Sequence, residues 1–116
     1  MYSDEQYNIA FKIFDKLETN ATENINIRIE IMRKKNNPQE KNLLEQLKRD
    51  IEMRCLSIYE FLALLINTGE IENSRIIDFF KMTLISDTQI IFEEYPEIKE
   101  DKTMLQELHK LLALWE

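Results

Sequence analysis

Apolar residues recur every three or four positions along almost the whole chain, which is the spacing of one face of a helix. The first such stripe contains Tyr7, Ala10, Phe11, Phe14 and Leu17. Ser3 and Gln6 have the spacing of a capping box, and Tyr2 and Tyr7 have that of a hydrophobic staple. The pattern therefore predicts a helix that begins at about residue 3.

The stretch that follows fits two kinds of element. Four β-branched residues alternate with polar ones, as in a strand: Ile25, Ile27, Ile29 and Ile31. Ile25, Ile29 and Met32 also keep helical spacing, and no second strand candidate exists that could pair with this one. Because an unpaired strand would leave its backbone groups unsatisfied, we expect the helix to continue to about residue 35. A second capping box that starts at Asn20 leaves a break at residues 19–22 as the alternative.

A second long helix is expected from about residue 38 to residue 68. Asn37 can cap its first turn, Pro38 suits the first helical position, and Glu40 places a carboxylate near the amino terminus. No further Pro or Gly interrupts the chain until Gly69, which suits a left-handed end. The apolar stripe of this helix contains Leu44, Leu47, Ile51, Cys55, Ile58, Leu62 and Leu65.

Two shorter helices are expected after this pair, at about 73–94 and 102–115. The residue before a proline disfavours helical geometry, so the first of them should end before Pro96. It is apolar over more than one face, which predicts a central position. The last helix carries a single stripe of Leu105, Leu108, Leu112 and Trp115.

These elements predict an all-α fold in which residues 1–116 form a single helical domain. Residues 3–35 and 38–68 should form a long antiparallel hairpin that packs with the two shorter helices as a four-helix bundle. Facing residues of such a hairpin have position numbers with a constant sum. Five apolar pairs give sums of 75 or 76: Met32 with Leu43, Ile29 with Leu47, Ile25 with Ile51, Leu17 with Ile58, and Phe14 with Leu62. Ile27 and Ile31 lie outside this seam, and we expect them to mediate self-association.

Cysteine and histidine usage limits the chemistry that the chain can carry. The chain has one cysteine, Cys55, and one histidine, His109, which exclude an internal disulfide and a structural zinc site. Cys55 lies in an apolar run and is expected in the core, and a single glycine cannot supply a phosphate-cradling loop. No cofactor is expected. No segment reads as a leader or a membrane span, so we expect a cytoplasmic protein.

Charge is unevenly distributed along the chain. The net charge of −7 disfavours binding to nucleic acid. Residues 28–54 hold eight basic and five acidic residues, a net charge of +3. An acidic cluster follows later and could face a basic protein partner: Glu93, Glu94, Glu97, Glu100 and Asp101. Glu97 and Glu100 have the spacing of a magnesium-binding pair, but no second pair accompanies them.

Glu60 stands alone within the apolar run from Cys55 to Leu65. A carboxylate in such a place needs a polar or cationic partner, and Ser57 lies one turn before it. We expect Glu60 and Ser57 to be structural buried polar residues.

Residues 54–115 resemble a family of small helical proteins of unknown function from bacteria and their viruses. The residues that carry the resemblance are the run from Ile58 to Ala63, then Gly69 with Ile71 and Glu72, and finally Leu105, Leu108, Leu112 and Trp115. Many members begin with a membrane helix, which this sequence lacks. The resemblance implies a helical fold and no particular activity.

The leading functional hypothesis is a non-enzymatic interaction or oligomerisation module that forms a homodimer. One alternative is an acidic inhibitor or mimic, of the kind that mobile elements carry, which docks on a basic nucleic-acid-binding protein. The third, a magnesium-dependent enzyme using the carboxylates from Glu93 to Asp101, has the least support. Neither nucleic acid nor a membrane is expected as a partner.

Overall fold

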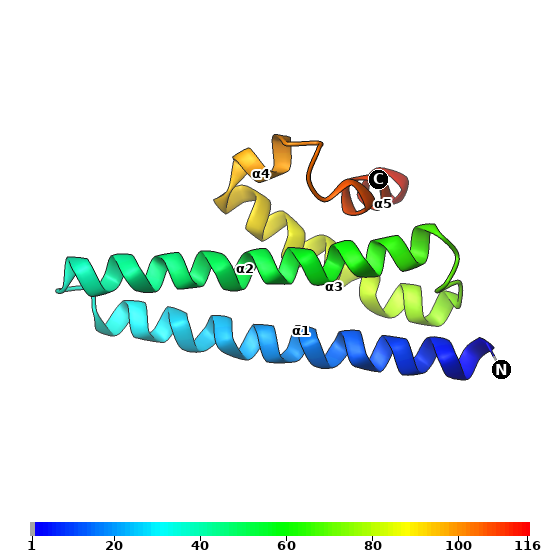
Figure 1. The fold of residues 1–116 in the computed structure, drawn as a ribbon, viewed down its shortest axis with the longest axis horizontal. Coiled ribbons are helices and arrows are strands. Elements are labelled where there is room, and N and C mark those ends of the chain that lie inside the picture. The colour runs from blue at the N-terminus through cyan, green and yellow to red at the C-terminus, as the bar shows by residue number, and fades with distance from the viewer. Residues whose placement is uncertain (1) are drawn as a thin grey trace.

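The computed structural model describes residues 2–116, and their side chains from Asp4 onward. The side chains of Ser3 and Tyr2, on which the expected capping box and staple depend, therefore lie outside the described part of the structure. The helices are α1 (Tyr2–Arg33), α2 (Pro38–Asn67), α3 (Ser74–Glu94), α4 (Pro96–Glu100) and α5 (Gln106–Trp115). The predicted all-α fold with a long hairpin is confirmed (Figure 1).

The helices α1 and α2 lie antiparallel along their whole length (Figure 1). Helix α1 is continuous through residues 19–22, so the alternative of a break there is wrong. Asn20 does not cap a new helix. Its side-chain amide instead reaches across the hairpin and donates a buried 2.8 Å hydrogen bond to the carbonyl oxygen of Ile51 in α2.

The face of α1 that meets α2 differs from the prediction. Most buried and half-buried positions of α1 fall on two series with seven-residue spacing: Gln6, Ile13, Asn20 and Ile27, and Ala10, Leu17, Asn24 and Ile31. The predicted seam between the two helices is wrong toward the loop that connects α1 and α2. Five members of the seam are exposed there: Ile25, Ile29, Met32, Leu43 and Leu47. A seven-residue repeat keeps one helical face against a neighbouring helix over many turns. Polar residues at three of these positions conceal that repeat from a count of apolar residues.

The ends of α2 follow the local sequence signals. Asn37 Oδ1 accepts a hydrogen bond from the amide of Glu40, and Pro38 occupies the first turn. Gly69 has a φ of 81° just beyond the end of α2, as predicted. Asn73 then caps α3.

Gln6 fixes α1 to the turn before α3. Its side-chain oxygen accepts hydrogen bonds from the amides of Glu72 and Asn73, at 3.0 and 2.8 Å. The partner of Gln6 is therefore this distant turn.

Helix α2 is the centre of the molecule, and α3 is not. The helix α5 packs on α2, on the side opposite α1, while α3 begins beside α1 and crosses α2 (Figure 1). The core lies among α2, α3 and α5, and its fully buried side chains include Tyr59, Leu56, Leu62, Leu84 and Leu108. The predicted central position of α3 is wrong, because it leaves Phe79, Met82 and Ile90 exposed.

The predicted last helix is also shorter than expected. A loop at residues 101–105 replaces its first turn, after the additional short helix α4, and Leu105 adopts a left-handed conformation with a φ of 54° before α5 begins. Leu105 provides no side-chain cap for α5. The exposed amides at the start of α5 therefore need partners from another element.

Candidate functional site

One face of α1 carries large apolar side chains that are only partly covered. We call it the outer stripe and define it as Tyr7, Phe11, Phe14, Ile25, Ile29 and Met32, all of which are exposed. Phe11 is 66% exposed and Met32 is 73% exposed. Figure 1 shows α1 at the edge of the molecule, with the other helices on one side of it. The outer stripe is therefore open to a partner.

The outer stripe consists of two triads with the same spacing. The aromatic triad is Tyr7, Phe11 and Phe14, and the aliphatic triad is Ile25, Ile29 and Met32. Corresponding members are eighteen positions apart in the sequence, which is about five turns of helix. Both triads therefore point in the same direction, within an arc of about 60°.

The aromatic triad borders a hollow between α1 and α3. The rings of Phe14 and Phe79 lie 5.8 Å apart, and Phe79 makes an edge-on contact with Phe80 at 5.1 Å. The hollow has a volume of about 400 Å³ and is lined by these aromatic side chains together with Ala10, Ile76 and Arg75. Exposed aromatic side chains around an apolar hollow are typical of protein interfaces.

The two residues predicted to mediate self-association are not on this surface. Ile27 and Ile31 belong to the two series that carry most of the buried positions of α1, and both are half-buried. That Ile27 and Ile31 mediate self-association stays a prediction, and their partial burial within their own chain does not favour it. The eighteen-residue repeat of the two triads is the sequence signal that could have identified the outer stripe.

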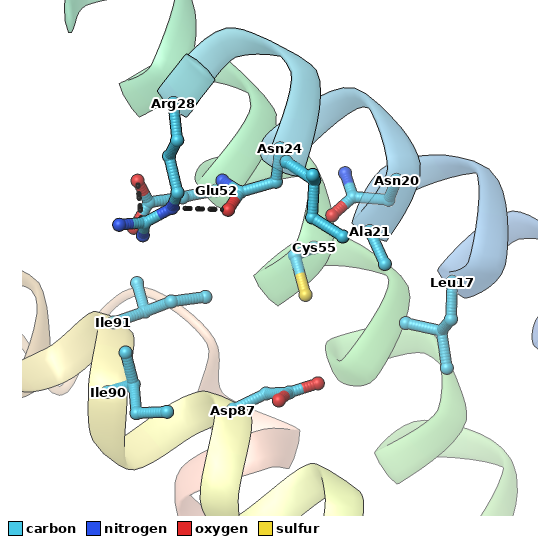
Figure 2. A pocket seen from close by; sticks show the side chains of 11 residues that line it. Leu17, Asn20, Ala21, Asn24, Arg28, Glu52, Cys55, Asp87, Ile90 and Ile91 are labelled. Carbon is cyan, nitrogen blue, oxygen red and sulfur yellow. Dashed lines mark hydrogen bonds and ion pairs between the residues drawn. The ribbon is translucent and has the colours of Figure 1, made fainter. Parts of the chain in front are cut away.

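A second hollow of about 260 Å³ lies between α1, α2 and α3 (Figure 2). Its polar lining comes from all three helices: Asn20, Asn24, Arg28, Glu52, Cys55 and Asp87. Figure 2 shows the Cys55 sulfur and the Asp87 carboxylate facing into the space from α2 and α3. The buried hydroxyl of Tyr59 donates a 2.6 Å hydrogen bond to Asp87. The rest of its lining is apolar, and we call this space the polar hollow after its amide and charged side chains.

Arg28 and Glu52 of this lining belong to a cluster of four charged side chains. The ammonium of Lys48 lies 2.8 Å from Glu52 Oε1 and also binds Glu94. Arg28 of α1 lies 3.8 Å from Glu52 and 4.0 Å from Glu94. The cluster balances two cations with two carboxyl groups and joins α1, α2 and α3.

The two carboxyl groups of this cluster differ in proton affinity. Glu52 is only 3% exposed, and burial together with its hydrogen bond to Glu94 raises the pKa of Glu52. Burial alone would also raise the pKa of Glu94, but hydrogen bonds with Glu52 and Lys48 outweigh it and lower that pKa. Glu52 therefore binds a proton more readily than Glu94 does, and Glu94 is the more acidic of the two carboxyl groups that face Lys48.

The thiol of Cys55 is held in its protonated form. Burial, with smaller contributions from the charges of Asp87 and Glu52, raises the pKa of Cys55 to about 12. A thiol of this kind is a poor nucleophile at neutral pH. The structure thus places Cys55 in the core, as the sequence predicts.

The acidic residues from Glu93 to Asp101 differ in their partners. Glu94 belongs to the Lys48 cluster, and Glu97 lies 3.5 Å from Arg49. Asp101 accepts hydrogen bonds from the amide and hydroxyl of Thr103, while Glu93 and Glu100 are exposed. Across residues 2–116, no group of three or more potential ligands is arranged to hold a metal ion.

Glu60 binds the start of α5. Its two carboxylate oxygens accept hydrogen bonds from the amides of Glu107 and Leu108, at 3.2 and 2.7 Å. Its partner is not Ser57, which is exposed and donates to the carbonyl oxygen of Met53 in its own helix. The predicted burial of Ser57 and its possible pairing with Glu60 are wrong, because the partners of the half-buried Glu60 are amides at the start of another helix.

His109 has a packing role in α5. Its ring stacks on Phe92 at 5.5 Å, and Nδ1 lies 3.5 Å from the ammonium of Lys102. Burial and the charge of Lys102 lower the pKa of His109, so it is neutral at pH 7. No carboxylate hydrogen bond to the ring is formed by the described residues, so the orienting partner of a catalytic histidine is not in place.

Comparison with protein-family models, curated proteins and solved structures finds no match to this chain. The resemblance of residues 54–115 to small helical proteins stays a prediction. Among the described helices, none combines the length and apolar character that crossing a bilayer requires.

Proposed function

We propose that this protein is a non-enzymatic helical module that associates with a second copy of itself. The observation that carries the proposal is the outer stripe of α1, in which both apolar triads are exposed along one side of a long helix. Isolated exposed apolar residues are common on protein surfaces, whereas aligned sets usually mark an interface. A surface that lies on every copy can bury itself by two-fold pairing.

The structure gives less support to the alternative of an acidic mimic. Such a protein needs a continuous acidic surface that is free to meet a basic partner. Glu94 and Glu97 form ion pairs with Lys48 and Arg49 of their own chain, so two of the exposed carboxylates of the cluster are already paired. Self-association is therefore the function that we propose.

Sedimentation equilibrium at concentrations from 1 to about 100 µM tests the proposal. We expect a mass that rises to twice the 14.0 kDa of one chain. The double variant Phe11→Glu with Ile29→Glu should fold as a helical monomer. Association would require each new carboxylate to be buried in the interface, which is unfavourable. A parent protein that stays monomeric throughout this range would overturn the proposal.

A matched control separates the outer stripe from exposed apolar surface in general. Leu43 of α2 is 61% exposed, close to the exposure of Phe11, and lies outside the outer stripe. Leu43→Glu should leave the dimer intact. Equal loss of association in this control would show that the outer stripe is not the interface.

A further inference from the structure

The order of residues in the outer stripe carries information about how two copies pair. We infer that the α1 helices of two copies pack antiparallel about a two-fold axis that passes near Thr19 and Asn20. This inference rests on the proposed self-association and adds the orientation of the partner. In this arrangement the aromatic triad of each copy packs on the aliphatic triad of the other.

The apolar pattern of α1 is nearly symmetric when the helix is reversed. Antiparallel pairing about this axis brings together residues whose position numbers sum to 39 or 40. Three pairs then form between the copies: Tyr7 with Met32, Phe11 with Ile29, and Phe14 with Ile25. The two aliphatic triads of the dimer would thus fill the two aromatic hollows beside Phe79. Aliphatic side chains on aromatic rings fill such hollows without polar atoms.

The centre of α1 also fits a close antiparallel crossing. Glu18, Ala21 and Thr22 separate the two triads, and all three are exposed. Antiparallel pairing places Glu18 beside Ala21 of the other copy, where a small side chain leaves room. Parallel pairing in register would instead place the two Glu18 carboxylates side by side, which is unfavourable.

Charge at the two ends of α1 favours the same orientation. The exposed residues Asp4 and Glu5 make the amino-terminal end acidic, and the exposed residues Lys34 and Lys35 make the hairpin tip basic. Antiparallel pairing brings each acidic end beside the basic tip of the other copy. Parallel pairing would bring together two tips that belong to the segment 28–54, which has a net charge of +3.

The area available is sufficient for a specific interface. Helix α1 has 32 residues and is therefore about 48 Å long. A helix with side chains is about 11 Å wide, so one face covers about 500 Å² per copy and about 1,000 Å² in the dimer. That total reaches the lower limit for specific association, and the exposed ring of Phe79 extends it.

Distances between spin labels on the two copies test the orientation. Single cysteines at Glu5, Thr19 and Lys35, all exposed, would carry the labels in a Cys55→Ser background. Antiparallel pairing predicts about 40 to 50 Å between the two copies for the labels at residues 5 and 35, and less than about 25 Å for residue 19. If Cys55→Ser impairs folding, native Cys55 can be kept, because it is buried and its pKa is about 12.

The outcomes separate the orientation from self-association itself. Short distances at all three positions, in a protein that sediments as a dimer, would show parallel pairing and overturn the inference alone. A dimer with a long distance at residue 19 would show pairing through another surface. A monomer in sedimentation would overturn the proposed function, and the orientation with it.

Discussion

The Oε1 atom of Glu60 in α2 accepts a 2.7 Å hydrogen bond from the amide of Leu108 in the first turn of α5. Helix α5 has no side-chain cap of its own, because the residue before it is Leu105. A carboxylate 48 positions away in the sequence therefore performs the task of a capping residue. Its negative charge also interacts favourably with the amino-terminal end of the helix dipole.

Replacement of Glu60 should destabilise the fold through α5. We expect Glu60→Ala to lower the free energy of unfolding by about 1–3 kcal/mol, because two amides lose their acceptor. Glu60→Gln should cost less, since its one side-chain oxygen can still accept a hydrogen bond. Ser57→Ala is the matched control and should have almost no effect. Urea unfolding followed by circular dichroism gives all three values.

Removal of Lys48 should make stability depend more strongly on pH. Lys48 lowers the pKa of Glu52 and opposes the effect of burial, so Lys48→Met raises the pKa of Glu52 further. The folded state then binds a proton more tightly than the unfolded state, and stability falls as pH rises through the interval between the two pKa values. The penalty of Lys48→Met relative to the parent should therefore be larger at pH 7 than at pH 5. A penalty that is equal at both pH values would contradict the raised pKa of Glu52.

Cys55 should react with thiol reagents only when the fold opens. A pKa of about 12 leaves almost no thiolate at pH 8, and burial restricts access. We expect labelling by a disulfide reagent at pH 8 to be slow in the native protein and fast in denaturing urea. Rapid stoichiometric labelling without denaturant would show that the polar hollow is more open than the structure indicates.

Glu18→Leu should strengthen self-association. This substitution would join the two triads into one continuous apolar stripe and remove a charge from the centre of the proposed interface. The added burial predicts a dissociation constant lower by about tenfold. Glu45→Leu, at an exposed site on α2, is the control and should leave the constant unchanged. Sedimentation equilibrium measures the dissociation constant of each variant. An equal decrease for Glu45→Leu would indicate nonspecific hydrophobic association.

Local sequence signals predicted most of the helices, but they did not predict the contacts between helices that are distant in the sequence. Asn37, Pro38 and Gly69 act on the adjacent backbone, so their effect on the ends of α2 is visible in the sequence. The acceptor role of Glu60 depends on where α5 docks, and no local pattern specifies that position.

The inner and outer faces of α1 were confused for a different physical reason. Ile25 and Ile29 are as apolar as Ile27 and Ile31, so hydrophobicity alone does not decide which pair is buried. Polar residues on the same face as Ile27 and Ile31 hold the missing information, because Gln6 and Asn20 on that face have partners in other elements. The alternative reading of Asn20 as a helix cap did not point to such a partner.

Two side-chain amides therefore select which face of α1 turns inward. Gln6 binds the turn before α3, and Asn20 binds the carbonyl of Ile51, and each bond is possible only in one rotational setting of α1. Leucine at both positions would fit either setting and would permit α1 to roll its aromatic triad against α2. The amides oppose that rolled state, in which the aromatic side chains would be hidden. By fixing the rotation of one helix, they keep exposed the outer stripe that we propose as the surface for a second copy.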